Sequence, residues 1–321
     1  RRGSSDDGAG AALDGAIDAR AFNLVRAAGK ANVIKSSSPD VLRGECHWYR
    51  SIPPALEKLF PRPVEIVEGD KSSDEAALST ITMSKVPGTT FSHLVTARLL
   101  MKVCLRNLIG ALHRIHTQEP PPGSPVASEE KASVGELCTN YAGKVSRRFA
   151  KHKALYDTLG EEIGIDTRRM ADRIVRFLEE FEGNELPVHA YYIHGDPVFS
   201  NAIRTEDDEI VLIDMRGELG SRLTTQGDVY YDLSKVYQSL SGYDFMLLDQ
   251  ELDETSSEIF DGLRATFWEE VRRLYPNVVH RSIRLHTASH FFTIVPLHEV
   301  RSRMVRYLRT SHSMLLVEGL M

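Results

Sequence analysis

The chain has 321 residues, 42% of them hydrophobic, and carries a formal net charge of −6 at pH 7. A chain of this size can bury a large core and divide into two units, whereas its acidic balance argues against a general nucleic-acid-binding protein. The three cysteines, Cys46, Cys104 and Cys138, are too few and too scattered for a disulfide framework or a thiolate zinc site. No apolar run approaches the roughly 20 residues of a membrane span, and no signal peptide is evident. We therefore expect a cytoplasmic protein with neither nucleic acid nor membrane as a partner.

The N-terminus predicts a flexible tail. Residues 1–20 are rich in Gly, Ala, Ser and Asp, which is typical of a segment that forms no packed core. The first residue is Arg rather than Met. We therefore expect a fragment or an excised domain of a longer protein.

A small β-rich unit is predicted over residues 21–86. One helix is expected over residues 41–60, with a kink or break at Pro53-Pro54. Strands are expected at residues 21–26, in Asn32-Val33-Ile34-Lys35, and at residues 78–86.

Residues 87–321 predict a larger, mainly helical unit. Apolar residues recur at helical spacing from Leu94 to His116, with Leu99, Val103, Leu108 and Leu112 on the expected buried face. Residues 118–135 contain four prolines together with Ser and Glu, so a mobile surface insertion is expected there. Further helices are expected at residues 137–159, 167–181, 228–240, 256–274 and 281–308.

The most informative segment is His-Gly-Asp-Pro-Val-Phe-Ser-Asn at 194–201, followed by Val-Leu-Ile-Asp at 211–214. Strands at residues 199–204 and 209–214, joined by a turn, would bring Asn201 and Asp214 toward each other. Phosphoryl transfer needs one carboxylate to orient and deprotonate an acceptor hydroxyl, and two oxygen ligands for Mg²⁺. Asp196, Asn201 and Asp214 supply all three. The D-x-x-x-x-N spacing means little by itself, but the apolar run that ends at Asp214 strengthens it.

These residues resemble the Brenner motif of the aminoglycoside phosphotransferase and choline kinase-like superfamily, small-molecule relatives of protein kinases. The resemblance implies that Asp196 is the catalytic carboxylate and that Asn201 and Asp214 bind Mg²⁺. The later stretch Gly227 to Lys235 resembles the G-D-x-x-Y-D-L-A sequence of this superfamily, and it makes Asp228 and Asp232 candidate contacts to substrate or phosphate.

The implied fold is α+β, a two-lobed protein kinase-like fold. Residues 21–86 would form a small β-rich N-lobe that binds ATP, and residues 87–321 a larger, mostly helical C-lobe with the catalytic loop and the acceptor site.

A kinase-like N-lobe needs a strand lysine that is held by a helix glutamate and contacts the nucleotide phosphates. Lys35 ends an apolar strand pattern, and Glu45 follows ten residues later. Lys30 is the competing lysine, but it lies beside Gly29 in a predicted turn. Met83 and Lys85 fall where the linker between the lobes would contact adenine. No G-x-G-x-x-G precedes Lys35, so the glycine loop is either degenerate or missing.

Two features bear on the acceptor. Arg216 follows Asp214 closely; pointing inward it would favour an anionic acceptor or stabilise the transferring phosphoryl group, and pointing outward it would form a scaffold ion pair. The Asp-x-Arg-Gly form and the run through Lys235 resemble a branch linked with sugar and surface-polysaccharide metabolism, some of whose members are fused to a nucleotidyltransferase domain. His286, His290 and His298 have a spacing that zinc can use, but the acid of H-E-x-x-H is absent, and core or hydrogen-bonded histidines are expected instead.

The sequence thus predicts an ATP- and Mg²⁺-dependent phosphotransferase with a small-molecule hydroxyl acceptor, a sugar or sugar-like alcohol. Three alternatives stay open at this point. The chain could be a catalytically silent nucleotide-binding module of a larger protein, or a kinase for an amino-alcohol or aminoglycoside-type acceptor. A metal-dependent hydrolase built on His194 and Asp196 would need further ligands.

Overall fold

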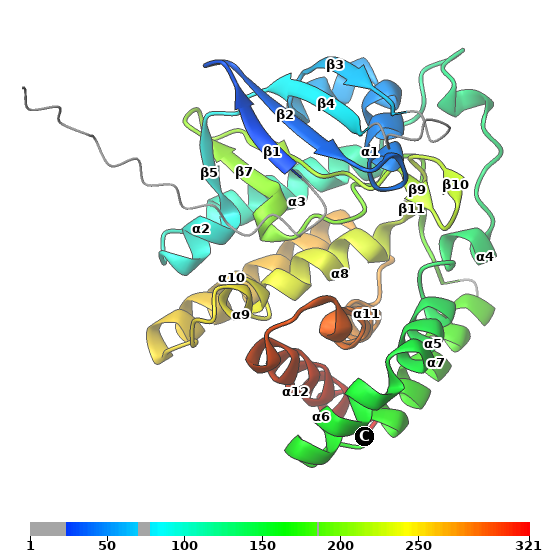
Figure 1. Ribbon diagram of the computed structural model, residues 1–321, viewed down its shortest axis with the longest axis vertical. Coiled ribbons are helices and arrows are strands. Elements are labelled where there is room, and N and C mark those ends of the chain that lie inside the picture. The colour runs from blue at the N-terminus through cyan, green and yellow to red at the C-terminus, as the bar shows by residue number, and fades with distance from the viewer. Residues whose placement is uncertain (1–23, 70–77, 185) are drawn as a thin grey trace, which may run out of the picture.

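An antiparallel four-stranded sheet forms the N-terminal part of the computed structural model, which describes residues 24–69, 78–184 and 186–321 (Figure 1). The strand order is β1-β2-β4-β3, so β2 lies inside the sheet and places Lys35 opposite Val25 on one side and Ile81 on the other. The tail at 1–20 and the first residues of the predicted 21–26 strand lie outside the described residues. The strands are β1 (Leu24–Ala28), β2 (Asn32–Ser37), β3 (Pro63–Val67) and β4 (Ser79–Ser84).

Helix α1 (Pro39–Ser51) packs against this sheet and ends shortly before the two consecutive prolines. Residues 54–59 continue as a separate 3-10 helix, η1 (Pro54–Leu59). Proline removes a backbone donor and restricts the residue before it, so the predicted helix over 41–60 breaks where the sequence indicated.

The catalytic-loop hairpin forms as predicted. Strand β7 (Ala202–Thr205) pairs with β8 (Ile210–Leu212), and Ala202 lies opposite Leu212. Asn201 itself belongs to a short 3-10 turn, η3 (Phe199–Asn201), rather than to the strand. Strand β5 (Gly88–Thr90), the first element after the N-terminal sheet, pairs with the other edge of β7 and joins the two parts of the chain.

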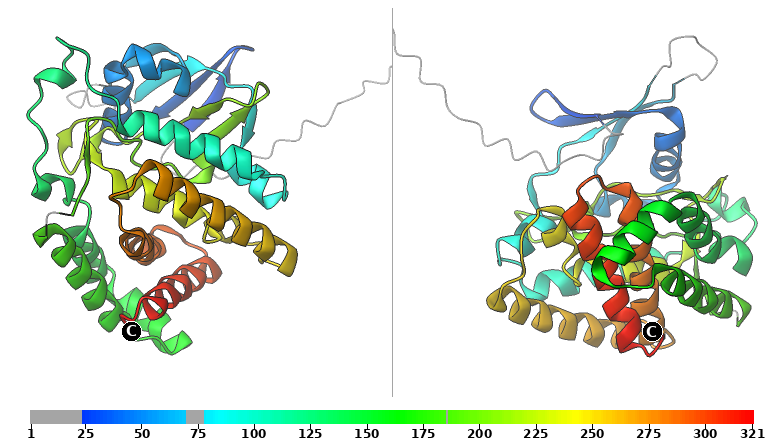
Figure 2. Two further views of the ribbon diagram at one scale, coloured as in Figure 1. Left: turned by 180° about the vertical axis from the view of Figure 1, so that it is seen from behind. Right: turned by 60° about the horizontal axis from the view of Figure 1, so that its bottom comes forward.

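The remaining chain is a helical lobe built around α8 (Val229–Ser239), in which every residue is buried. Helix α11 packs on α8, and α12, α5 and α7 surround α11 in the views of Figures 1 and 2. The other helices and short strand pairs are α2 (Phe91–Thr96), α3 (Lys102–His116), η2 (Val126–Ser128), α4 (Val134–Leu137), α5 (Ala142–Lys151), α6 (Lys153–Ile163), α7 (Thr167–Gly183), α9 (Tyr243–Leu247), α10 (Glu254–Leu274), α11 (His280–Ile294), η4 (Val295–Leu297), α12 (Arg301–Val317), β6 (His189–Ala190) with β11 (Gly227–Asp228), and β9 (Glu218–Leu219) with β10 (Arg222–Leu223).

These elements confirm the predicted combination of a small antiparallel sheet and a larger helical part, the α+β class. The predicted helices at 167–181, 228–240 and 256–274 correspond to α7, α8 and α10. Asp166 caps α7 by accepting a hydrogen bond of 2.9 Å from the backbone N–H of Arg169, as a helix N-cap residue does.

Three predicted long helices were wrong in their continuity. The helix expected from Leu94 to His116 is interrupted between α2 and α3, where Arg98 adopts a left-handed backbone with φ of 61°. Leu99 and Val103 are consequently 63% and 50% exposed, although both were expected on the buried face with Leu108 and Leu112. The other two helices break at His152 and near Pro296; the proline explains the second break.

The expected insertion at 118–135 lies against the β10 region. The Thr224 hydroxyl donates to Glu129 at 2.7 Å, and the backbone N–H of Ala132 donates to Gln226 at 2.8 Å. Val126 is buried. The mobility of this segment stays a prediction.

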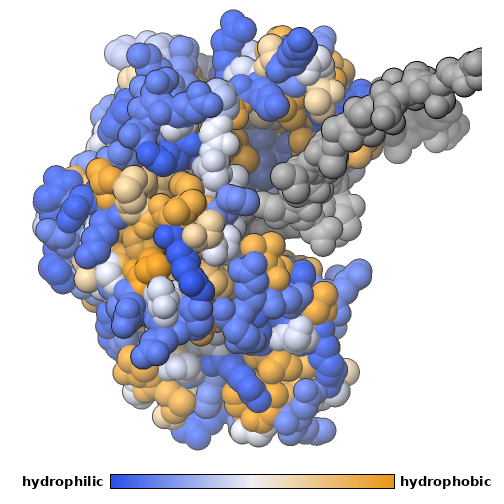
Figure 3. Space-filling model, turned by 90° about the vertical axis from the view of Figure 1, so that its left-hand side faces the viewer, coloured by the Kyte–Doolittle hydropathy of each residue, from blue (hydrophilic) through white to orange (hydrophobic). Residues whose placement is uncertain are grey.

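On the face shown in Figure 3, hydrophobic residues gather in patches that hydrophilic residues separate. Among the described residues, no helix has the length and apolar character that crossing a membrane requires.

Two glycines allow α1 to approach the loop after β8. A Cβ on Gly44 would overlap the carbonyl oxygen of Arg216, and a Cβ on Gly217 would overlap the carbonyl oxygen of Gly44. Gly217 also has a left-handed φ of 61°, which glycine adopts without steric cost. Trp48, on the same helix, donates its indole N–H to the Ile193 carbonyl at 2.8 Å. The sheet lobe is therefore joined to the helical lobe through α1.

We predict that Gly44→Ala lowers the free energy of unfolding by about 1–3 kcal/mol, because the added methyl group forces α1 away from the loop. Urea denaturation measures this change. Gly110→Ala in α3 is the matched control, since no atom lies within 4 Å of its added Cβ; it should stabilise the protein by about 0.5–1 kcal/mol. If the two substitutions changed the free energy of unfolding equally, the close approach of α1 to the loop after β8 would not contribute to stability.

Candidate active site

Lys35 is the centre of the nucleotide side of the candidate site. Its amino group lies 2.5 Å from Glu45 Oε2 on α1 and 2.6 Å from Asp214 Oδ1 in the loop after β8. The Lys35 and Glu45 side chains are almost fully buried, whereas the Asp214 side chain is 44% exposed. The predicted pairing of Lys35 with Glu45 is therefore present, and Asp214 joins the pair.

Burial and charge oppose each other in this triad. Burial lowers the pKa of Lys35, but the carboxylates of Glu45 and Asp214 outweigh it, so the net shift of the pKa is upward. Burial raises the pKa of Glu45 to about 7 although Lys35 lowers it. The amino group thus keeps its charge, and Glu45 depends on it to stay ionised.

Backbone hydrogen bonds on both sides of Asp214 fix the position of this residue. The N–H of Ile213 donates to the Asn201 carbonyl at 3.0 Å, and the N–H of Arg216 donates to the His194 carbonyl at 2.9 Å. Asp214 lies between these bonds with a left-handed φ of 63°, a conformation that costs a non-glycine residue energy and is common at functional sites. The predicted neighbours Asn201 and Asp214 are therefore held next to the catalytic loop.

The oxygens of Asn201 and Asp214 fit Mg²⁺. The Asn201 amide nitrogen donates to the Asp196 carbonyl at 2.9 Å, which fixes the amide. The amide oxygen accepts the Ser200 hydroxyl at 3.4 Å and keeps a second lone pair for a ligand. Mg²⁺ prefers such oxygen ligands and usually takes one or two from the protein together with substrate phosphates. In the described part of the chain, no group of three or more His, Cys, Asp or Glu residues could hold a metal ion, so substrate oxygens would complete this site.

One buried carboxylate holds the catalytic loop through hydrogen bonds. Asp232 on α8 accepts the backbone N–H groups of His194 and Gly195, each at 2.7 Å, and lies 3.0 Å from His116 Nε2. The His194 ring in turn accepts the Asp196 N–H at 3.1 Å through Nδ1, and burial lowers the pKa of this imidazole. His194 is thus a neutral ring that organises the loop.

Two of the candidate substrate contacts are corrected by the structure. Asp228 and Asp232 are buried, and their oxygens are occupied within the protein. Asp228 accepts the Tyr141 hydroxyl at 2.5 Å and the Val188 N–H at 2.8 Å. Both carboxylates position backbone segments, and neither has a surface that a substrate could reach.

The two predicted adenine contacts differ. Met83 is a buried residue of β4, and its sulfur lies 3.4 Å from the Tyr49 hydroxyl. Lys85 is exposed, and its backbone N–H already donates to the Ala31 carbonyl at 2.8 Å. The N–H of Lys85 is therefore not available to adenine, and contacts of Met83 and Lys85 with adenine stay predictions.

Asp196 faces a residue that the sequence reasoning missed. Lys235 on α8 is buried and places its amino group 3.0 Å from Asp196 Oδ1. The sequence did contain a sign of this residue, because Lys235 is the last residue of the motif-like stretch that starts at Gly227. Its side-chain direction, however, follows only from the packing of α8.

Arg216 points inward. Its guanidinium donates to the Tyr231 hydroxyl at 2.6 Å, and its Cζ lies 5.0 Å from the centre of that ring. Lys144 Nζ on α5 lies 3.4 Å from the same hydroxyl. We call Lys144, Arg148, Arg216 and Lys235 the basic cluster; Arg148 lies one turn beyond Lys144 on α5. The sequence reasoning missed Lys144 and Arg148.

Of the three histidines considered for zinc, His286 and His290 are core residues, whereas His298 is half-buried and its ring lies 5.0 Å from that of Tyr307. His286 is buried among Tyr141, Phe181 and Phe177, and burial lowers its pKa to about 3. His290 Nε2 lies 2.8 Å from the Ser234 hydroxyl. Packing accounts for both rings.

Known structures share this architecture. The type VIII aminoglycoside 3'-phosphotransferase has a TM-score of 0.50 and 17% identity, covering 95% of this chain and 92% of that one. The amicoumacin kinase hAmiN, solved with AMP-PNP, Ca²⁺ and its ligand, has a TM-score of 0.52 and 14% identity over 91% and 87% of the two chains. The spectinomycin phosphotransferase APH(9)-Ia, solved with ADP and spectinomycin, has a TM-score of 0.52 and 11% identity over 94% and 91%.

No protein-family model and no curated protein matches the sequence. The three structures nevertheless show that the chain has the two-lobed protein kinase-like fold of the aminoglycoside phosphotransferase group. The predicted resemblance is confirmed for the fold. The sugar-linked branch stays a prediction.

We predict that Asp232→Asn lowers the free energy of unfolding by about 1–3 kcal/mol, because the amide has one acceptor oxygen and leaves a buried loop N–H unpaired. Chemical denaturation provides the measurement. Asp207→Asn, in the exposed turn between β7 and β8, is the control and should change stability by less than about 0.5 kcal/mol. An unchanged midpoint for Asp232→Asn would show that the loop does not depend on this carboxylate.

Proposed function

We propose that the protein is an ATP- and Mg²⁺-dependent kinase that transfers a phosphoryl group to a hydroxyl of a small molecule. The observation that carries this proposal is the arrangement of Lys35, Glu45 and Asp214 beside the catalytic loop. An ammonium held between two carboxylates, one of them partly exposed, is suited to nucleotide phosphates and their metal ion.

Each polar residue of the site has a role in this proposal. Lys35 contacts the nucleotide phosphates and is oriented by Glu45. Asn201 and Asp214 would hold Mg²⁺, and the metal ion would supply positive charge to the phosphate oxygens. Asp196 accepts the proton of the acceptor hydroxyl while the oxygen of that hydroxyl bonds to the γ-phosphorus. The bond between the γ-phosphorus and the oxygen that bridges it to the β-phosphorus breaks, and ADP leaves. Lys235 keeps the Asp196 carboxylate in position and adds positive charge beside the reacting oxygens.

The neighbours support the reaction class. Two of them were solved with AMP-PNP or ADP, and their names give antibiotics as the molecules on which they act. Their identity to this chain is below 20%, so their acceptors do not transfer. We propose a sugar-like alcohol as the acceptor and the cytoplasm as the location. We also propose that the parent chain carries another domain, such as a nucleotidyltransferase.

The nucleotide site has a direct binding test. We predict that Mg²⁺ and AMP-PNP bind together and that Asp214→Ala weakens the binding about tenfold or more, which corresponds to about 1.4 kcal/mol per factor of ten. Isothermal calorimetry with and without Mg²⁺ measures it, and circular dichroism confirms that the variant is folded. Asp207→Ala, an exposed turn residue, should bind like the wild type. Equal affinities for all three proteins would refute the assignment of Asp214.

Turnover tests the catalytic carboxylate separately. We predict that Asp196→Asn lowers kcat by about 10²–10⁴-fold, as expected for the loss of a general base, while the affinity for Mg²⁺ and AMP-PNP is retained. ADP release in the presence of hydroxyl compounds is the assay. Transfer at the wild-type rate by Asp196→Asn would show that another group accepts the proton.

A further inference from the structure

The basic cluster places three cations beside one phenol, and the charge of a fourth residue, Arg148, also interacts with it. Lys144 and Arg216 lie within hydrogen-bonding distance of the Tyr231 hydroxyl, at 3.4 and 2.6 Å. Lys235 Nζ lies 6.0 Å from the centre of the same ring. Arg148 donates one N–H to the Thr293 carbonyl at 2.9 Å, which leaves other donors of its guanidinium.

Acidic residues do not balance this charge. In the described ranges, Asp196 is the one carboxylate within 4.0 Å of a cluster cation, and it faces Lys235. The charge of Glu218 also acts on Arg216, but Glu218 is paired with Arg43 at 3.0 Å. One carboxylate and one phenol therefore face four cations.

The remaining positive charge perturbs its neighbours. Although burial acts in the opposite direction, Arg216, Lys144 and Lys235 lower the pKa of Tyr231 to about 7. Burial and the neighbouring cations Arg216, Lys235 and Arg148 lower the pKa of Lys144 to about 8. Partly buried cations without counter-charges are costly, and a bound anion would remove that cost.

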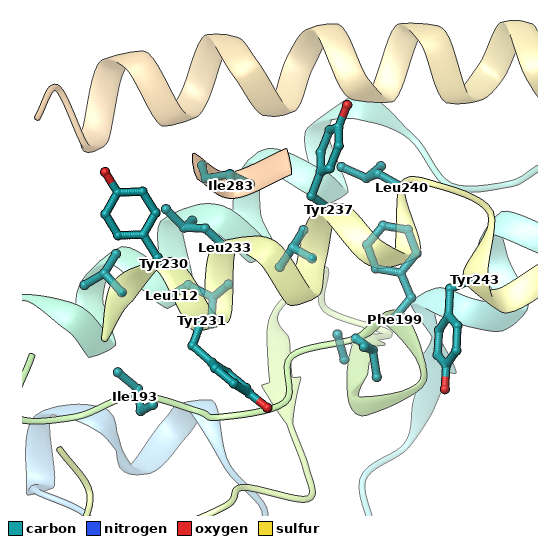
Figure 4. Close-up of a cluster of buried hydrophobic side chains, with 14 of the residues drawn as sticks. Leu112, Ile193, Phe199, Tyr230, Tyr231, Leu233, Tyr237, Leu240, Tyr243 and Ile283 are labelled. Carbon is teal, nitrogen blue, oxygen red and sulfur yellow. The ribbon is translucent and has the colours of Figure 1, made fainter. Parts of the chain in front are cut away.

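The cluster lies on the acceptor side of the site. Lys235 contacts Asp196, the proposed proton acceptor, while Lys144 and Arg148 come from α5 in the helical lobe, away from the sheet that carries Lys35 (Figure 1). Tyr231 leaves α8 on the side opposite Tyr230 and Tyr237 (Figure 4). Lys144, Arg148 and Arg216 are half-buried residues.

We propose, on the basis of the kinase function above, that the acceptor is an anion: a hydroxyl compound with a phosphate or carboxylate group, which the basic cluster binds. Lys144 and Arg148 hold the anionic group from α5, and the hydroxyl to be phosphorylated lies toward Asp196. Lys235 and Arg216 stand between this anion and the transferring phosphoryl group, and serve both.

The nucleotide phosphates are the other anions that the basic cluster could bind. To separate the two, the nucleotide site is first saturated with Mg²⁺ and AMP-PNP, and sulfate is then titrated by calorimetry at constant ionic strength. Sulfate keeps its charge between pH 6 and 9 and mimics a phosphate ester. We expect sulfate to bind, and Lys144→Met/Arg148→Met to weaken that binding at least tenfold.

The same helix offers a matched control. Arg147→Met/Lys151→Met removes the same two charges from exposed positions of α5 and should leave sulfate binding unchanged. Lys144→Met alone, which keeps the Arg148 bond to Thr293, guards against a folding defect and should also weaken binding. Absence of sulfate binding, or equal weakening by the cluster and control variants, would overturn the proposal.

Transfer assays separate this proposal from the kinase function. Glucose 6-phosphate, glucuronate, glucose and kanamycin are compared as acceptors, so that phosphate and carboxylate sources are distinguished from neutral and cationic compounds. Faster transfer to an anionic compound, lost in Lys144→Met/Arg148→Met, supports the proposal. Faster transfer to glucose or kanamycin would overturn the anionic acceptor while the kinase function stands. Failure of the wild type to bind Mg²⁺ and AMP-PNP would instead remove the kinase function.

Discussion

The buried ion pairs of the Lys35 amino group hold the two lobes together at the candidate site. The amino group is shared by Glu45 and Asp214, so strand β2, helix α1 and the loop after β8 must stay together to keep a buried charge paired. Gly44 and Gly217 make this geometry possible because their backbones touch where any side chain would intrude. The ion pair and the glycine contact thus fix the same helix in place, and together they orient the nucleotide side of the site before a ligand binds.

A second buried charge organises the other half of the site. Asp232 binds two backbone N–H groups of the catalytic loop, and α8 also carries Lys235, which faces Asp196. One fully buried helix therefore sets both the path of the loop and the charge beside its carboxylate. This arrangement explains why an acidic residue near the motif need not touch a substrate.

The positive charge around Tyr231 bears on which acceptor the site admits. An aminoglycoside carries several ammonium groups, and the basic cluster would repel it, since like charges placed together cost several kcal/mol. The shared architecture fixes the fold, whereas we propose that the residues on α5, α8 and the loop after Asp214 determine which acceptor approaches.

The motif residues and the hairpin that joins Asn201 to Asp214 could be predicted from the residues alone, because short spacing and local turn chemistry govern both. The partnership of Lys35 with Glu45 followed from the resemblance to kinase-like proteins. The sequence also located the helix break at Pro53-Pro54. The break at Arg98, the structural roles of Asp228 and Asp232, the inward direction of Arg216 and the contact of Lys144 with Tyr231 became evident only from the folded chain. These depend on which face of a helix is packed against a distant segment, and side-chain direction and long-range pairing leave no periodic signal in the chain.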